Sequence, residues 1–478
     1  MSRYLGIDLG TTTIAGVVLD TDSSQVVARH SISNDSRLPS DEQPPGHSEW
    51  DIDRMVELSL RVISTVTAQI DVDALAGLGV TGQMHGMVLL DASGQPVSPF
   101  IGWQDQRCEE QISADKTYLQ QMLELAGDGF EHSGCTPATG YMGSTLFWLS
   151  HNDLLPADTA ACFALDYLVS RLCGTTPVTD PTNAASAGIF DVAAGAWNDE
   201  LIASLGLRAR HLPPVQPSCQ AVGNLTESAG ARTGLPVGLP VTNGCGDNQA
   251  SFAGSVADCD RSVLVNIGTG AQISAFTEQP LLAQGIDLRP ALESGFLLVG
   301  AGLCGGRSYR LLRDFFYQVG RDIFGLADMP QIYDVLNQLA SEVPPGADGL
   351  HCEPLFTGSR QQPDRRAIWR GMSEPNFTPG HMARALLEGL AEQIRMLYER
   401  MQQAGLGDHD LLVGSGNAIR KNQLLADILS AWFDLPLQMT TYTEEAAVGA
   451  ALCAAVATGQ FSDIQQASRG VVGLSRPN

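Results

Sequence analysis

The chain has 478 residues, a length that suits two or three globular domains. Apolar residues make up 44% of it and charged residues 17%, which excludes an intrinsically disordered chain. The formal net charge of −25 argues against nucleic acid or an anionic membrane as partner, because both require a basic surface.

The two ends of the chain and its cysteines bear on its cellular location. An apolar stretch begins directly after Met1-Ser2-Arg3, so we expect no secretory signal, and the longest apolar run, residues 446–457, is too short to cross a bilayer. The ten cysteines include no C-x-x-C pair, so we expect neither a zinc site nor a disulfide framework. We therefore expect a cytoplasmic protein with reduced thiols. The sequence leaves open whether the protein forms a homodimer.

The first predicted element is a β-hairpin over residues 5–19. Two apolar runs flank the turn Asp8-Leu9-Gly10-Thr11-Thr12-Thr13. Glycine lets a backbone approach an anion, and the N–H groups and threonine hydroxyls of such a turn can surround phosphate oxygens. The carboxylate of Asp8 suits this site if a divalent cation lies between it and the phosphate. An ordinary hairpin with a polar turn is the alternative.

A helix is predicted next, because Ser48-x-x-Asp51 is typical of a capping box and an apolar stripe follows it. After the strand 78–80 come two loops rich in polar and aromatic groups. Their candidate sugar-binding residues are Gln83, Met84, His85, Trp103 and Asp105. A polyhydroxylated sugar needs polar partners for its hydroxyls and an aromatic face for its C–H side. A structural histidine and a core tryptophan are the alternatives.

A tract rich in proline and glycine, residues 205–246, closes the first half of the chain. The run Asn243-Gly244-Cys245-Gly246-Asp247-Asn248-Gln249 then places one carboxylate in a glycine-lined turn. Phosphoryl transfer to an alcohol needs a base that takes the hydroxyl proton, and Asp247 is the candidate. An Asx-turn or helix cap is the alternative. We place a domain boundary here, with domains at 1–249 and 250–478.

A second predicted hairpin, residues 263–273, repeats the design of the first. Its Asn266, Gly268 and Thr269 align with residues 8, 10 and 11 at a constant offset. Two such hairpins predict a duplicated α/β fold with nucleotide phosphates between its halves. The pair resembles the phosphate motifs of the actin, hexokinase and heat-shock chaperone superfamily. That resemblance implies two ribonuclease-H-like domains separated by a cleft.

The last predicted elements are a helix and a strand–turn–helix. Thr378-Pro379 begins the helix, an apolar stripe follows, and Gly405 ends it. The run Leu411 to Asn417 contains the glycine turn Gly414-Ser415-Gly416, against which a flat adenosine could lie. The chain has only two lysines, Lys116 and Lys421, and neither lies in a Walker A or protein-kinase setting. A nucleotide would therefore bind through the two hairpins.

Together these motifs resemble one family over essentially the whole chain, the FGGY carbohydrate kinases. The matching pieces, in chain order, are Asp8 to Thr13, Gly82 to Gly86, Trp103 to Arg107, Gly246-Asp247-Asn248, Gly268-Thr269-Gly270, Gly305 to Ser308, Gly414 to Asn417 and Glu445 to Ala451. The resemblance implies ATP-dependent phosphorylation of a sugar hydroxyl.

It also implies roles for individual residues. Asp247 would be the general base, and Asp247 and Asn248 would contact the sugar together with the loop residues named above. Asp8 and Asp247 would lie near Mg²⁺. Phosphate contacts would come from Thr11, Thr12, Thr13, Gly268 and Thr269. The nucleoside pocket would involve Gly306, Gly414, Gly416 and Asn417.

Details of the loops favour a ketose as substrate. The pair Met84-His85 resembles the pair found at this place in ketose kinases, whereas glycerol kinases carry Arg-Glu there. The run Trp103-Gln104-Asp105 resembles sedoheptulokinases, whereas xylulokinases have Asn after the tryptophan. We expect phosphorylation of the terminal primary hydroxyl of sedoheptulose, with D-xylulose as the alternative. An actin-fold ATPase acting on protein is the alternative outside the sugar kinases.

Overall fold

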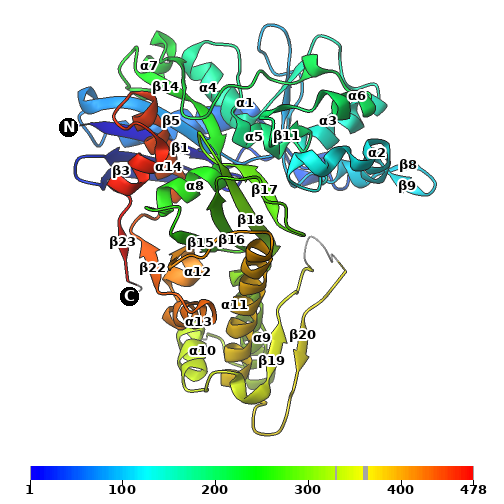
Figure 1. The fold of residues 1–478 in the computed structure, drawn as a ribbon, viewed down its shortest axis with the longest axis vertical. Coiled ribbons are helices and arrows are strands. Elements are labelled where there is room, and N and C mark those ends of the chain that lie inside the picture. The colour runs from blue at the N-terminus through cyan, green and yellow to red at the C-terminus, as the bar shows by residue number, and fades with distance from the viewer. Residues whose placement is uncertain (1, 329–330, 359–363, 477–478) are drawn as a thin grey trace.

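The computed structural model describes residues 2–328, 331–358 and 364–476, which form two lobes, each built on one mixed sheet (Figure 1). The first sheet has the strand order β13-β14-β5-β1-β2-β3. Its strands are β1 (Arg3–Leu9), β2 (Thr13–Asp20), β3 (Gln25–Ser33), β5 (Leu75–Gly82), β13 (Ala221–Asn224) and β14 (Pro240–Gly246). The second sheet has the order β17-β18-β16-β15-β21-β22-β23. Its strands are β15 (Ser262–Ile267), β16 (Ala271–Thr277), β17 (Asp287–Pro290), β18 (Phe296–Leu303), β21 (Leu411–Ser415), β22 (Leu437–Thr440) and β23 (Leu474–Ser475).

Helices and short hairpins surround the sheets. The helices up to the junction are α1 (Ile52–Thr67), α2 (Tyr118–Ala126), α3 (Met142–His151), α4 (Ala164–Cys173), α5 (Pro181–Ser186), α6 (Asp199–Ser204), α7 (Glu227–Thr233) and α8 (Asp247–Ser255). The later helices are α9 (Gly306–Phe324), α10 (Ile332–Ser341), α11 (Pro379–Gln403), α12 (Asn417–Arg420), α13 (Gln423–Phe433), α14 (Glu445–Ala457) and α15 (Ile464–Val471). Short strand pairs are β4 (Glu49–Trp50) with β7 (Phe100–Ile101), β6 (Val88–Leu90) with β10 (Ala160–Cys162), β8 (Gln111–Ser113) with β9 (Lys116–Thr117), β11 (Phe190–Asp191) with β12 (Ala196–Trp197), and β19 (His351–Glu353) with β20 (Ile368–Arg370).

The two sheets share one topology, which confirms the predicted duplicated α/β architecture. In the first sheet, β1 pairs antiparallel with β2 and parallel with β5. In the second, β15 pairs antiparallel with β16 and parallel with β21. In each sheet a polar turn joins this antiparallel pair: residues 10–12 lie between β1 and β2, and residues 268–270 lie between β15 and β16. The predicted division at residue 249 falls in the first turn of α8 and stays a prediction.

Helix caps explain where two predicted helices begin. Thr378 caps α11 as predicted, and its hydroxyl accepts the backbone N–H of His381 at 3.3 Å. The helix predicted to follow Ser48-x-x-Asp51 begins at Ile52 as expected, but the cap at Ser48 that a capping box implies is wrong. Asp51 caps α1 by accepting the N–H of Arg54 at 2.9 Å, because residues 49–50 pair with β7 instead of entering the helix.

Helix α14, close to the C-terminus, packs on the first sheet (Figure 1). Its apolar side chains form a buried cluster with Tyr4 and Leu19 of that sheet and with Ala250 of α8. The backbones approach very closely: a Cβ added at Gly449 would lie 1.9 Å from the carbonyl oxygen of Ala250. The apolar run of α14 is thereby explained as core, and among the described residues no helix has the length and apolar character that a membrane span requires.

We predict that Gly449→Ala lowers the unfolding temperature, because the added methyl group meets backbone that cannot turn aside. Overpacking of this kind costs about 1–3 kcal/mol. Differential scanning calorimetry measures the effect. Gly407→Ala is the matched control, since a Cβ there meets no atom of the described chain within 4 Å. Equal unfolding temperatures for the two variants would contradict the close packing of α8 and α14.

Candidate active site

A cavity of about 280 Å³ lies where the two sheets meet, at the ends of several predicted motifs. Both halves of the chain line it. Its lining residues are Thr11, Gln83, Met84, His85, Trp103, Asp247, Asn248, Gln249, Gln272, Asp287, Arg289, Val299 and Ala301. The structure therefore brings together all the predicted sugar-loop residues except Asp105, and adds Thr11 of the first turn and the junction residues 247 and 248.

A chain of hydrogen bonds joins the first polar turn to the two loops that carry the candidate sugar-binding residues. Nε1 of Trp103 donates to Oγ1 of Thr11 at 3.0 Å, and that hydroxyl donates to Oε1 of Gln83 at 3.1 Å. Trp103 is 45% exposed, so the core position considered as an alternative does not describe it. Thr11 thus lies in the sugar-sized cavity and couples its two loops.

His85 is held in one orientation and one tautomer. Its backbone has a φ of 77°, and its Nδ1 lies 2.8 Å from the carbonyl oxygen of Ser186. A carbonyl only accepts, so Nδ1 carries a proton, and in the neutral ring Nε2 is then the acceptor. The ring stacks on Tyr141 with centroids 4.1 Å apart. The sequence could identify this histidine, but its partners come from α5 and the start of α3.

Asp105 does not line the cavity. Its carboxylate is completely buried and accepts hydrogen bonds from the Arg107 guanidinium at 2.7 and 2.9 Å. It also accepts the backbone N–H groups of Ser48, at 2.8 Å, and of Arg107. These partners occupy both oxygens, so the predicted sugar contact does not fit this arrangement. Asp105 instead fixes the loop that carries Trp103.

Asp247 is the first residue of α8, directly after β14. A side chain fixes the backbone of the preceding residue, since the N–H of Gly246 donates to Oγ1 of Thr182 at 2.8 Å. That hydroxyl in turn donates to the buried carboxylate of Asp180 at 2.7 Å, and Ser218 donates to the same carboxylate at 2.6 Å. A buried polar network thus determines where Asp247 enters the cavity.

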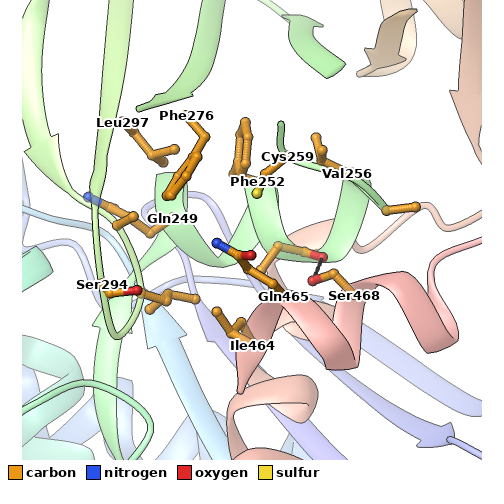
Figure 2. A pocket seen from close by; sticks show the side chains of 14 residues that line it. Gln249, Phe252, Val256, Cys259, Phe276, Ser294, Leu297, Ile464, Gln465 and Ser468 are labelled. Carbon is orange, nitrogen blue, oxygen red and sulfur yellow. Dashed lines mark hydrogen bonds between the residues drawn. The ribbon is translucent and has the colours of Figure 1, made fainter. Parts of the chain in front are cut away.

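Helix α8 is also anchored on the side of a small apolar crevice of about 40 Å³ (Figure 2). There the hydroxyl of Ser468 in α15 donates to the carbonyl oxygen of Ala253 at 2.9 Å. Phe252 and Ile464 also line this crevice. Gln249 of α8 lines both the crevice and the larger cavity. The helix that begins with Asp247 is therefore fixed by contacts around both of them.

Asp8 and Asp247 lie on the same edge of the first sheet. Asp8 and Cys245 both pair with Thr81 of β5, from its two sides, and Asp247 follows two residues later. Burial, with the neighbouring charges of Asp247 and Glu444, raises the pKa of Asp8 to about 8. Burial raises the pKa of Asp247 to about 6. Each shift reflects a carboxylate that is poorly solvated in the protein alone.

This arrangement fits a divalent cation. Oδ1 of Asp8 is buried and has no hydrogen-bond partner in the described part of the chain. A cation between two repelling carboxylates would neutralise both. The described residues include no group of three or more His, Cys, Asp or Glu that could hold a metal alone. Mg²⁺ needs no such group, since it commonly uses one or two carboxylates with waters and substrate phosphates.

A second cavity of about 520 Å³ lies in the second lobe, beside the second polar turn. Four of the predicted nucleotide residues line it: Gly268, Thr269, Gly306 and Asn417. The turn is fixed to α9, because the N–H of Gly306 donates to the carbonyl oxygen of Gly268 at 2.9 Å. The cationic side chains Arg307, Arg310 and Lys421 also line this cavity. Arg307 lies in the matching run Gly305 to Ser308, whereas no role was predicted for the other two.

Four other predicted nucleotide residues line neither cavity. Thr12 and Thr13 are exposed beside the first turn. Gly414 lies within β21, where an added Cβ would be 2.6 Å from the sulfur of Met439. Gly416 has a φ of 86°, and an added Cβ would be 2.5 Å from the carbonyl oxygen of Ile267. Both glycines allow β21 and its turn to approach their neighbours closely, and their contacts with a nucleotide stay predictions.

One wall of the first cavity contains no residue predicted to bind the sugar. Gln272, Asp287, Arg289, Val299 and Ala301 come from β16, β17 and β18 of the second sheet. Alternation of charged and apolar residues in Asp287-Leu288-Arg289-Pro290 is the signal that could have pointed to them, because residues two apart in a strand share one face. Nothing local indicated that this face meets the first lobe.

Comparisons with known proteins cover almost the whole chain. The N-terminal domain of the FGGY family of carbohydrate kinases matches residues 3–254, and its C-terminal domain matches residues 263–458. A xylulose kinase of Haemophilus influenzae is 26% identical, over 96% of this chain and 91% of that protein. A sedoheptulokinase of Mus musculus is 27% identical, over 94% of this chain and 96% of that protein. The crystal structure of xylulose kinase from Rhodospirillum rubrum has a TM-score of 0.87 at 25% identity, covering 100% of this chain and 94% of that chain.

We predict that Asp8→Asn stabilises the protein in metal-free, nucleotide-free buffer, and increasingly so as the pH rises. With a pKa of about 8 when folded against an ordinary 3.8, wild-type Asp8 keeps a proton that the unfolded chain has lost. Its contribution to stability is therefore greatest below pH 4 and is lost as the pH rises to about 8. Asparagine has no such loss.

Thermal unfolding between pH 5 and pH 8.5 measures this difference. We expect the gap between variant and wild type to widen across that range, by about 1–2 °C for each kcal/mol. Asp41→Asn, at an exposed carboxylate, is the control and should show no widening gap. A gap for Asp8→Asn that stays constant with pH would show that the Asp8 carboxyl is ionised throughout.

Proposed function

The chain belongs to the FGGY family of carbohydrate kinases and phosphorylates a carbohydrate, and we propose that it transfers the γ-phosphate of ATP to the terminal primary hydroxyl of a ketose. The observation that carries this proposal is the position of Asp247. It is a poorly solvated carboxylate that opens helix α8 on the wall of a cavity large enough for a sugar. Family membership decides against the alternative of an actin-fold ATPase that acts on protein.

The cavity has the chemistry of a polyol site. Three of its lining residues carry amide atoms that are buried without a hydrogen-bond partner in the described part of the chain. These atoms are Nε2 of Gln83, Oδ1 of Asn248 and Oε1 of Gln249. They comprise one donor group and two acceptors, which a series of sugar hydroxyls can satisfy, since a hydroxyl both donates and accepts. The exposed indole of Trp103 supplies an apolar face beside them.

Asp247 would act as the general base. Its raised pKa of about 6 leaves the carboxylate mostly ionised at neutral pH and still basic enough to take a proton from a hydroxyl. In our mechanism the substrate hydroxyl donates to Asp247 while its oxygen attacks the γ-phosphorus in line with the departing ADP. Closure of the lobes would exclude water, which otherwise competes as acceptor.

ATP would span the two cavities, with its nucleoside in the second and its γ-phosphate near the first. The cationic residues of the second cavity and the turn at Gly268 support this placement. Thr11 would contact the γ-phosphate from the sugar side, because its hydroxyl already lies between Trp103 and Gln83. Asp8 and Asp247 would hold Mg²⁺, which when bound would neutralise negative charge on the phosphates.

Sedoheptulose is the ketose that we propose, with D-xylulose as the alternative. Met84 and His85 support a ketose, and the run Trp103-Gln104-Asp105 supports the seven-carbon sugar by its resemblance to sedoheptulokinases. Because Asp105 is fully engaged within its own loop, it would act on this choice by placing Trp103 and not by touching the sugar.

We predict that Asp247→Asn lowers kcat by about 10²–10⁴-fold, the usual contribution of a general base. The amide keeps the size of the side chain but cannot accept the proton. A coupled assay of ADP release with saturating ketose and Mg–ATP measures the loss, and Asp41→Asn serves as the control. Unchanged turnover in Asp247→Asn would remove this residue from the mechanism.

We predict sugar-dependent ADP release with ketoses at neutral pH. Sedoheptulose, D-xylulose, D-ribulose, L-ribulose and glycerol would be compared at equal concentration with Mg–ATP. We expect the highest kcat/KM with sedoheptulose and the lowest with glycerol. A clear preference for D-xylulose would overturn the choice of sugar, whereas turnover that depends on no sugar would overturn the proposed function.

A further inference from the structure

Resting on the proposed function, we infer that Asp287 and Arg289 determine the charge class of the substrate. They make the first cavity selective for neutral ketoses and exclude sugar acids. Neither residue belongs to a predicted motif, and both come from the second lobe, whereas the predicted sugar-binding residues that line this cavity come from the first half and the junction.

Strand geometry places the two side chains together on the cavity wall. Asp287 and Arg289 are two residues apart in β17, so both face the cavity, while Leu288 faces the core of the second lobe. Nη2 of Arg289 donates to Oδ2 of Asp287 at 2.9 Å. Arg289 is 5% exposed and the side chain of Asp287 is 17% exposed, so this ion pair is largely buried.

The pair is fixed relative to Asp247. Nη1 of Arg289 reaches the carbonyl oxygen of Ala185 in α5, at 3.4 Å. The N–H of Leu288 donates to the carbonyl oxygen of Gly134 at 2.7 Å, which joins β17 to the first lobe. Nε2 of Gln249, in the helix that begins with Asp247, donates to the carbonyl oxygen of Pro290 at 3.1 Å. A substrate that reaches Asp247 therefore lies against this strand.

The charged side chains around the first cavity determine which charge on a substrate can be accommodated. Among the described residues that line the cavity, Arg289 is the only lysine or arginine, whereas Asp247 and Asp287 are both carboxylates. Asp8 adds a third carboxylate beside Asp247. A carboxylate on the substrate would have to displace Asp287 from Arg289 or lie unpaired among like charges, and both are costly in a buried site.

A neutral sugar meets no such penalty. A guanidinium has five N–H donors, and the two hydrogen bonds just described use only part of them, so it can also donate to a neutral oxygen. Gln83, Asn248, Gln249 and Gln272 supply uncharged amides around the same cavity. Asp287 thus neutralises Arg289, the only lysine or arginine among the described lining residues, which could otherwise attract a sugar acid.

The test compares a neutral ketose with an open-chain polyol carboxylate. Sedoheptulose or D-xylulose, whichever the wild type uses better, and D-gluconate would be assayed with wild type, Asp287→Asn and the double variant Asp287→Asn/Arg289→Gln. We expect the wild type to prefer the ketose by about 100-fold or more in kcat/KM, because like charges in a buried site are strongly disfavoured. Asp287→Asn should move the ratio toward gluconate by about 10-fold or more, and the double variant should reverse that move.

Ligand-induced shifts in unfolding temperature, with the same two sugars, give the same comparison for any variant that folds but turns over slowly. A wild type that prefers gluconate, or an Asp287→Asn variant that loses activity on both sugars with an unchanged ratio, would overturn the inference. Wild-type protein that turns over no sugar would instead overturn the proposed function. Binding of the two sugars would still measure the selectivity in that case.

Discussion

The site depends on keeping two carboxylates close together in a poorly solvated place. Asp8 and Asp247 end up on one edge of the first sheet because β1 and β14 flank β5 in parallel. Their mutual repulsion and desolvation are unfavourable in the protein alone, as the raised pKa of Asp8 records. Surrounding structure holds them there regardless, through the Asp180 network at the end of β14 and the packing of α15 against α8. In the proposed mechanism a cation held by both carboxylates would relieve that repulsion, which would favour the complex in which phosphoryl transfer occurs.

The second lobe lines the first cavity as well as the second. Strand β17 closes the first cavity, and its backbone and side chains bond to α5, to the loop at Gly134 and to Gln249. This wall of the first cavity is therefore attached to the same elements that place Asp247. Under the proposed function, the strand that would contact the sugar and the base that would activate it are thus held together, although they lie in different halves of the chain.

The sequence predicted those features that local physical chemistry determines. The two polar turns, the cap of α11 and the loop with His85 carry their signals within a few residues, and each lies where it was expected. Features that depend on contacts between distant segments were not predictable. Asp105 looked like a sugar ligand because its partner Ser48 lies 57 residues away, and Asp287 and Arg289 looked ordinary because nothing nearby shows that β17 meets the first lobe. The cap of α1 at Asp51, and not at Ser48, likewise followed from the pairing of residues 49–50 with β7.

The position of α14 has a consequence for how the protein is made. A helix that ends at residue 457 completes the core beneath the first sheet, whose strands begin at residue 3. The N-terminal lobe therefore cannot finish folding while the ribosome is still synthesising the C-terminal lobe. Its sheet keeps one apolar face uncovered until residue 457 has emerged. Truncation or premature termination before residue 457 would thus harm the lobe synthesised first.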